Sequence, residues 1–133
     1  MLLGVGVDLL HLARLRSVLA RRGPERLAAR ILSCSERVEW ENLAEAGPVQ
    51  RERFLALRWT AKEAAYKALY PSIVPRWADL SVSKSGPKPI LAFSDQATFA
   101  RSPSISPEHV RMHLSVSHDA DLMVAYVVAE TVG

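Results

Sequence analysis

The order of apolar and polar residues predicts a helical first half of the chain. It begins with a strand-like segment, LLGVGVDLL at residues 2–10, and continues in helical spacing broken by two Gly-Pro pairs. Ser33 and Glu36 have the spacing of a capping box at the start of the third of these helices. The predicted helices cover residues 11–22, 24–32, 33–46 and 50–70.

After the long helix the pattern changes to short alternating runs, which predict strands. Residues 79–84 and 89–93, joined by SGPK, predict a hairpin, and SDQATFA after it predicts one short helix capped by its first serine. Residues 110–118 alternate strictly, residues 122–130 are mostly apolar, and DAD between them predicts a tight turn. We expect one α+β domain over residues 1–133, with an antiparallel sheet packed on the long helix and shorter helices.

Composition agrees with one globular domain and excludes several protein classes. The 133 residues are 49% hydrophobic and 23% charged, which excludes a disordered tail, a collagen and a small disulfide scaffold. No apolar run approaches the roughly 18 residues that span a bilayer. The one cysteine, Cys34, cannot form an internal disulfide, so a reducing compartment is the simplest assumption. We expect Cys34 to be a small, buried or half-buried hydrophobic residue.

Positive charge is concentrated near the start of the chain. The formal net charge is +3. Residues 11–30 contain six arginines and only one acidic residue, Glu25. Arg14 and Arg21 fall on the same side of the first predicted helix, opposite its leucines. Such a block is either a solvated helix face or a docking surface for an acidic protein or nucleic acid.

The long helix carries charged residues where an apolar face is expected. On a helical wheel, Arg58 and Lys62 fall inside or at the edge of the apolar arc, where a cation either meets an anion or extends its charged end to solvent. Glu63 and Lys67 lie on the opposite side at i, i+4 spacing. An ordinary surface ion pair is the simplest interpretation of those two.

Asp8, at the end of the first strand, suggests a second interpretation. An acid in that place caps the next helix or pairs with an arginine, but together with Glu63 it also provides the two carboxylates that a Mg²⁺ site uses beside substrate phosphates. Nearby lysine and arginine would neutralise the remaining phosphate charge, which suggests Mg²⁺-dependent chemistry on a phosphate ester or pyrophosphate.

The histidines point to neither zinc nor a hydrolase. Ser117, His118 and Asp119 are adjacent on a strand, so they face alternate sides and do not form a catalytic triad. Metal-ligand spacing is absent among the other histidines. His118 ends its strand in phase with Val116, on the predicted inner face, where a structural histidine is the simplest interpretation.

Three ordered motifs resemble those of a known family. GVGVDLLHLARL at the start, FLALRWTAKEAAYKAL in the middle and HLSVSHD near the end are similar to the 4′-phosphopantetheinyl transferases, and specifically to the small holo-acyl-carrier-protein synthase type. The similarity runs from Gly4 to about Ala129. It implies an enzyme that transfers the 4′-phosphopantetheine arm of coenzyme A to a serine of an acidic acyl carrier protein and releases 3′,5′-ADP. It also implies a homotrimer with active sites at subunit interfaces.

The resemblance also implies roles for individual residues. Asp8 and Glu63 would hold Mg²⁺, with Mn²⁺ as an alternative, and Lys67 would stabilise charge on the phosphate under attack. The family's positions around the coenzyme A phosphates and nucleotide correspond to Arg58, Lys62, Lys67, Pro89 and His118. Its positions for docking the carrier protein correspond to Arg14 and Arg21.

The chain departs from the family pattern after the long helix, where ALYPSIVPRWADL replaces a Gly-rich turn, and SGPKP replaces a shorter turn. An intracellular, cytoplasmic location is expected, or a mitochondrial one for a eukaryotic source. Two other functions stay open: a nucleic-acid-binding module that uses the arginine helix, and a silent relative that only binds carrier protein. Intact Asp8, Glu63 and Lys67 argue against the silent relative, and neither nucleic acid nor membrane is an expected partner.

Overall fold

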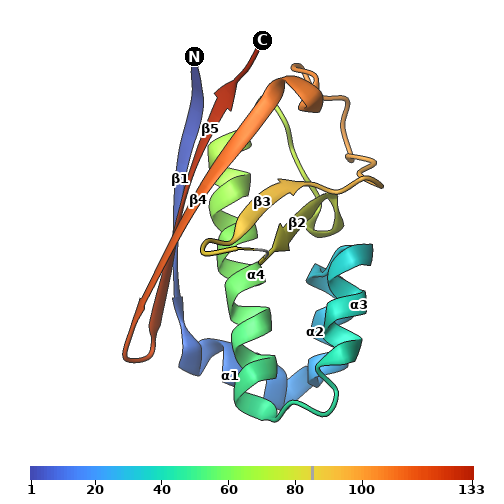
Figure 1. Cartoon of the computed structure of the whole chain (residues 1–133), viewed down its shortest axis with the longest axis vertical. Helices are drawn as coiled ribbons and strands as arrows, with labels where there is room; N and C mark the ends of the chain where they lie inside the picture. The colour runs from blue at the N-terminus through green and yellow to red at the C-terminus, as the bar shows by residue number, and fades with distance from the viewer. Residues whose placement is uncertain (85) are drawn as a thin grey trace.

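The computed structural model describes residues 1–84 and 86–133 and has one long helix, α4, at its centre (Figure 1). The helices are α1 (Leu12–Arg22), α2 (Pro24–Ile31), α3 (Cys34–Asn42) and α4 (Pro48–Leu69), with two short 3-10 turns, η1 (Trp77–Asp79) and η2 (Pro107–His109). The strands are β1 (Leu2–His11), β2 (Leu80–Ser83), β3 (Ile90–Phe93), β4 (Val110–Asp119) and β5 (Leu122–Thr131).

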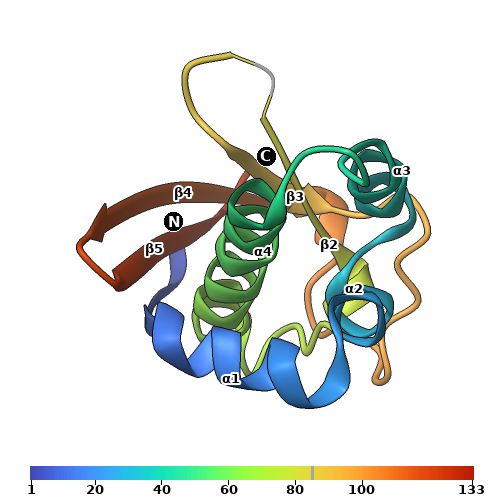
Figure 2. The ribbon, with the colours of Figure 1, turned by 90° about the horizontal axis from the view of Figure 1, so that it is seen from below.

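Two antiparallel sheets pack around α4. The larger sheet has the order β1-β5-β4, and the smaller one is the β2–β3 hairpin. Viewed along α4, the larger sheet lies on one side of the helix, and α2 and α3 lie on the other (Figure 2). The predicted α+β fold with an antiparallel sheet on the long helix is therefore confirmed.

Strand β1 approaches α4 closely because both elements carry very small residues at the contact. A Cβ added to Gly6 would lie 1.9 Å from the carbonyl oxygen of Ala64, and one added to Gly4 would lie 2.1 Å from that of Ala68. No side chain fits in that space, since real Cβ atoms do not approach a backbone oxygen so closely. The glycines thus bring β1, and Asp8 at its end, directly onto α4.

Helix α4 is buried on most of its circumference, so the cations in its apolar arc are buried as well. Its small residues Ala61, Ala64, Ala65 and Ala68 face the sheet core, where they meet Ala125 and Val127 of β5 among others. Nearer its start, Phe54, Leu55 and Ala56 pack with α1, α2 and α3 in a second cluster. With protein on several sides, Arg58 and Lys62 have no route to solvent and need partners inside the protein.

Most predicted elements are confirmed, with small shifts at their ends. The Ser33–Glu36 capping box is present at α3, but that helix ends at Asn42 instead of about residue 46. The strict alternation of β4 is confirmed, because Met112 and Leu114 are buried and their neighbours are exposed. The turn predicted between β2 and β3 includes Ser85, which lies outside the described residues.

The helix predicted for SDQATFA is wrong. The backbone N–H groups of Ser94 and Thr98 donate to the carbonyl and carboxylate oxygens of buried Asp79, at 2.7 and 3.0 Å. Phe99, with a φ of 44°, packs edge-on against Phe93 at 5.6 Å between ring centroids. These tertiary contacts hold the segment in an irregular path and override its local helical preference.

The inner position predicted for His118 is also wrong. The side chain has the phase of an inward residue, but β4 and β5 continue past the end of the core as a hairpin, and His118 is exposed there. Its imidazole is therefore accessible, and the structural role expected for a buried histidine does not apply.

Candidate active site

Asp8 lies where β1 crosses α4, and its partner there is Lys67. The Lys67 ammonium donates to the Val7 carbonyl at 2.9 Å and contacts the Asp8 carboxylate at 3.3 Å. Gly6 and Leu10, two residues before and after Asp8, are buried toward the helix, so the strand alternation turns Asp8 to the same side. The strand therefore aims this carboxylate at α4.

Glu63 lies one helical turn before Lys67 and is electrostatically coupled to Asp8. Partial burial raises the pKa of Glu63, the negative charge of Asp8 raises it further, and the positive charges of Lys67 and Arg14 act in the opposite direction. Among the described residues Lys67 makes its ion pair with Asp8, and none is found between Lys67 and Glu63. The simple surface pair considered from the sequence is therefore not formed.

The two carboxylates fit a magnesium ion better than a zinc ion. Within residues 1–84 and 86–133, no group of three or more histidine, cysteine and acidic side chains is placed to hold a metal ion, and a zinc site needs three or four such ligands. Mg²⁺ uses only one or two carboxylates and completes its shell with waters and phosphate oxygens. Partial burial and then the negative charge of Asp8 raise the pKa of Glu63, and a cation beside the two carboxylates would offset both effects.

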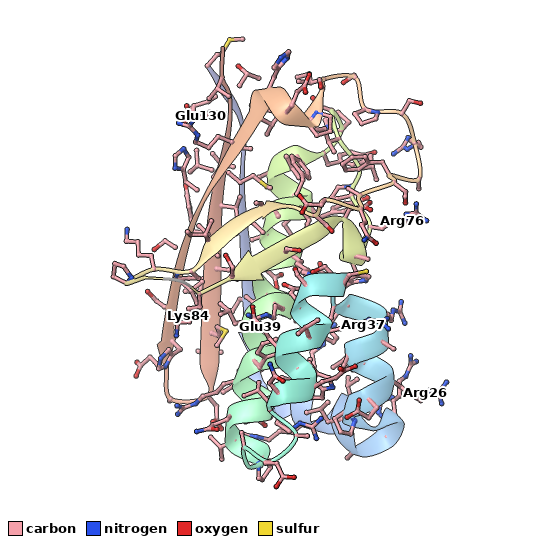
Figure 3. The ribbon with its side chains drawn as sticks, turned by 45° about the vertical axis from the view of Figure 1, so that its right-hand side comes forward. Arg26, Arg37, Glu39, Arg76, Lys84 and Glu130 are labelled. Atoms are coloured by element: carbon pink, nitrogen blue, oxygen red, sulfur yellow. The ribbon has the colours of Figure 1, made fainter. Side chains whose placement is uncertain are left out.

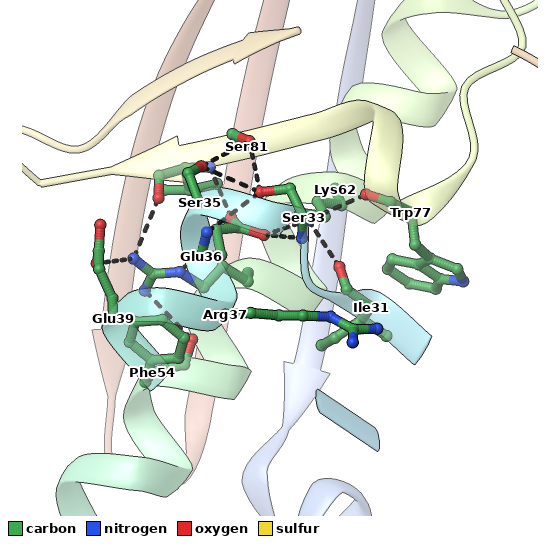
Figure 4. A network of polar contacts seen from close by, with 12 residues as sticks. Ile31, Ser33, Ser35, Glu36, Arg37, Glu39, Phe54, Lys62, Trp77 and Ser81 are labelled. Carbon is green, nitrogen blue, oxygen red and sulfur yellow. Dashed lines mark hydrogen bonds and ion pairs between the residues drawn. The ribbon is translucent and has the colours of Figure 1, made fainter. Parts of the chain in front are cut away.

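Arg58 and Lys62 form a buried network with Glu36 of α3 (Figure 4). Lys62 Nζ lies 2.6 Å from Glu36 Oε1, and Arg58 Nε lies 3.6 Å from Glu36 Oε2. Arg58 also donates to the Val82 carbonyl at 3.1 Å and contacts Glu39 at 3.3 Å. Burial lowers the pKa of Lys62, and the charge of Glu36 opposes that shift.

The sequence missed Glu36 as the counter-ion of this network, although a signal existed. Two cations in an apolar helical arc need a buried acid unless they extend to solvent, whereas the spacing of Ser33 and Glu36 predicts only a helix cap. In the structure it serves both purposes. The phosphate-binding roles of Arg58 and Lys62 remain predictions that this geometry does not favour, because both charged groups are already paired.

Two cavities of about 500 and 510 Å³ flank Glu63. The first, which we call the aromatic cavity, is lined by Arg30, Lys62, Glu63, Tyr66, Pro75, Arg76, Trp77, Ala78 and Leu80. The second, the arginine cavity, is lined by Val18, Arg21, Arg22, Arg26, Leu27, Arg30, Ile31, Trp59, Glu63 and Trp77. Arg30, Glu63 and Trp77 line both cavities, and we call these three residues the shared wall.

Positive side chains surround this region. Arg14 and Arg21 on α1 are exposed, as predicted, and Arg14 lies over the Trp59 ring at 6.0 Å from its centroid. Arg26 of α2 and Arg76 before η1 project from the same side of the molecule (Figure 3). The predicted basic surface therefore extends from α1 across α2 to the aromatic cavity.

Pro89 and His118 lie apart from the two cavities within one chain. Pro89 precedes β3, and His118 lies near the tip of the β4–β5 hairpin. Neither residue lines either cavity. The β4–β5 hairpin and α2 lie on opposite sides of α4 (Figure 2). Within one chain, these two residues therefore do not contribute to either cavity.

Comparison with known proteins identifies the class of this fold. The structure matches a holo-(acyl-carrier-protein) synthase from Bacillus anthracis in complex with CoA (3′,5′-ADP), with a TM-score of 0.73, 30% identity and 98% of each chain covered. It matches the synthase from Neisseria meningitidis with a TM-score of 0.75 and 28% identity, covering 98% of this chain and 100% of the other.

Sequence comparison gives the family. The family model of the 4′-phosphopantetheinyl transferase superfamily matches residues 4–126. A holo-[acyl-carrier-protein] synthase from Anaeromyxobacter sp. (strain K) is 38% identical over 138 residues, covering 100% of this chain and 99% of the relative. The chain belongs to the 4′-phosphopantetheinyl transferase superfamily. These relatives are bacterial, and nothing in the comparisons supports the mitochondrial alternative.

Proposed function

We propose that this chain transfers the 4′-phosphopantetheine group of coenzyme A to a serine of an apo acyl carrier protein, as a holo-[acyl-carrier-protein] synthase. The reaction forms a bond between the serine oxygen and the β-phosphorus of coenzyme A. It breaks the bond from that phosphorus to the bridging oxygen, releases 3′,5′-ADP, and frees the hydroxyl proton. The observation that supports the proposal is the Asp8–Lys67 ion pair, together with the electrostatic coupling of Glu63 to Asp8, in a chain of this superfamily.

Asp8 and Glu63 are the proposed ligands of Mg²⁺, with Mn²⁺ as the alternative. Bound between them, the cation would supply charge neutralisation at the pyrophosphate. The coupling of the two carboxylates supports this assignment, because a like-charged pair is stabilised by a cation. Each ligand comes from a different element, so the site depends on the close contact of β1 with α4.

Lys67 is the proposed phosphate-stabilising residue. An ammonium group has three N–H donors, and two of those of Lys67 go to Val7 and Asp8. The third is available to a phosphate oxygen, and the half-exposed side chain leaves it accessible. In this position Lys67 would stabilise negative charge that develops on the attacked phosphate and on the leaving group.

The surroundings of Glu63 suit both proposed substrates. Arginines in the adjoining cavities would neutralise coenzyme A phosphates. Arg14 and Arg21 on α1 are the proposed contacts for an acidic carrier protein, because they are exposed on the basic surface next to the site. In the described part of the chain, no helix has the length and apolar character needed to cross a membrane.

A homotrimer is the proposed assembly. The outer face of the larger sheet exposes the apolar side chains Val5, Val7 and Leu9 of β1 and Tyr126 of β5. Such a face is typical of a surface that another protein covers. His118 and Pro89, which do not line the cavities of their own chain, would then be supplied to the site of a neighbouring copy.

The test is the release of 3′,5′-ADP from coenzyme A, measured by chromatography with and without apo acyl carrier protein. We expect release only with the carrier, and its loss when EDTA removes divalent cations. Release without a carrier would indicate hydrolysis of coenzyme A. No release with several bacterial carriers, from folded protein, would contradict the proposal.

A further inference from the structure

Lys62 has no N–H group left for a substrate. Its side chain is 1% exposed, and its ammonium donates to the carbonyl of Ile31 at 2.6 Å, to Glu36 Oε1 at 2.6 Å and to the carbonyl of Trp77 at 3.0 Å. An ammonium has three donors and no acceptor. A phosphate oxygen can therefore be bound by Lys62 only if one of these three hydrogen bonds breaks.

Glu36 is as fully occupied as Lys62. Besides Lys62, its Oε1 accepts from the Ser33 backbone N–H at 2.9 Å, and its Oε2 accepts from the Val82 backbone N–H at 2.7 Å. The residue is 1% exposed. A buried ion pair contributes little net stability compared with apolar packing, but any displacement that separates its partners leaves a buried charge unpaired, which is costly. This pair therefore fixes where α3, β2 and α4 lie relative to each other.

Two of the hydrogen bonds of Lys62 end at or beside residues of the shared wall. Ile31 directly follows Arg30, Trp77 is itself part of the wall, and Lys62 directly precedes Glu63. Figure 4 shows Lys62 between the end of α2, the start of α3 and Trp77. One ammonium thus ties together the three segments that carry the wall residues Arg30, Glu63 and Trp77.

We propose that Lys62, held by Glu36, is a positioning residue for the transfer reaction and makes no direct contact with substrate phosphate. It fixes the shared wall of the aromatic and arginine cavities, and with it the position of Glu63. The expected effect on kcat rests on the proposed function. The hydrogen bonds by which Lys62 connects the three segments are a property of the fold and do not depend on that function.

The experiment compares Glu36→Gln, Lys62→Met and the double variant with the wild type. Glu36→Gln keeps the side-chain shape and removes the charge, so it frees the Lys62 ammonium. The double variant removes both charges, so it leaves no buried charge unpaired and tests the pair even if a single variant fails to fold. Glu39→Gln is the matched control, because Glu39 belongs to the same helix and network but contacts Arg58 instead of Lys62.

A positioning role predicts that Glu36→Gln and Lys62→Met both lower kcat by at least about tenfold, since small displacements of reacting groups have large effects on rate. Their effects should not add in the double variant. The dissociation constant of 3′,5′-ADP, measured by calorimetry, should change by less than about threefold in both. Glu39→Gln should keep kcat within about twofold.

A phosphate-binding role predicts a different pattern. Lys62→Met would then weaken 3′,5′-ADP binding by more than about tenfold, and Glu36→Gln would leave it unchanged or tighten it. That result would overturn the proposal, as would variants that keep the wild-type kcat. Hydrogen exchange gives a readout that needs no activity: both single variants should exchange faster in residues 24–36 and 71–82 but not in β4 and β5. If the wild type transfers nothing, the proposed function fails, and this exchange pattern still tests the connection.

Discussion

Lys67 on α4 reaches across to β1, where its ammonium lies 3.3 Å from Asp8 and 2.9 Å from the carbonyl oxygen of Val7. The contact joins the first strand to the long helix at Asp8, one of the two proposed metal ligands, and Lys67 lies one helical turn after Glu63, the other proposed ligand. It also distinguishes the two lysines of the helix. Lys67 is half exposed and has a donor to spare, whereas Lys62 is buried with all of its donors occupied.

Replacing Lys67 by methionine should lower transfer without unfolding the protein. Loss of one group that stabilises transition-state charge costs about 10²- to 10³-fold in kcat. Stability should change little, because the Lys67–Asp8 pair is partly exposed. Steady-state kinetics with thermal unfolding measures both quantities. Arg53→Met, on an exposed position of the same helix, is the control. Equal activity of Lys67→Met and wild type would remove Lys67 from the mechanism.

Asp8→Asn and Glu63→Gln should each abolish the stabilisation of the protein by Mg²⁺. We expect the melting temperature to rise with Mg²⁺ and coenzyme A in the wild type, since a ligand that binds only the folded state stabilises it. The rise should be lost in both variants and kept in Asp119→Asn, which changes an exposed acid at the end of β4. A full Mg²⁺-dependent rise in both variants would show that the ion binds elsewhere.

Gly6→Ala should destabilise the fold and damage the site together. The added methyl group would lie 1.9 Å from the carbonyl oxygen of Ala64, so β1 must move away from α4. Overpacking of this kind costs about 1–3 kcal/mol. Denaturant unfolding measures the loss, and Leu2→Ala, at an exposed position of the same strand, is the comparison. Wild-type stability in Gly6→Ala would mean that the strand and helix are not in such close contact.

Val7→Glu should separate the proposed trimer. Val7 pairs with Tyr126 in the register of β1 and β5, and both side chains are exposed on the outer face of the larger sheet. A buried unpaired charge at an interface is costly, so light scattering should detect a smaller species with reduced transfer activity. Val49→Glu, at an exposed valine of α4, should keep the wild-type mass. A monomeric, fully active wild type would contradict the shared site.

Glu25 should contribute stability that is lost at acid pH. Hydrogen bonds from Trp40 and then Arg51 lower the pKa of the Glu25 carboxyl below its usual value of 4.5. A group with a lowered folded-state pKa stabilises the protein above its unfolded-state pKa, and the contribution disappears as pH falls through the folded-state value. Glu25→Gln should therefore have a lower free energy of unfolding than the wild type at pH 7. Below about pH 4 the difference in free energy of unfolding between the two proteins should become smaller. Parallel pH curves for the two proteins would contradict this role.

Local patterns predicted most of the fold because they report local physics. Gly-Pro pairs mark the helix ends, the Ser33–Glu36 box begins α3, and period-two alternation identifies β4. The segment SDQATFA was mispredicted because its path depends on Asp79 and Phe93, which no local pattern encodes. The exposure of His118 depends on how far the hairpin extends beyond the core, which is likewise a tertiary property.

The site was predicted in part for the same reason. Asp8, Glu63 and Lys67 could be identified from motifs, but the pairing of Lys67 with Asp8 depends on how closely Gly6 lets β1 approach the helix. The network of Glu36 with Lys62 required knowledge of all the elements around α4. A helical wheel describes one helix face and does not reveal that α3 supplies a buried acid to it.

The central claim is tested most directly by the intact mass of an apo acyl carrier protein after incubation with this protein, coenzyme A and Mg²⁺. We predict a gain of one phosphopantetheine mass on the carrier, absent with EDTA and absent with the Asp8→Asn variant. A carrier of unchanged mass, in the presence of folded wild-type protein and a carrier that a known synthase modifies in parallel, would contradict the account.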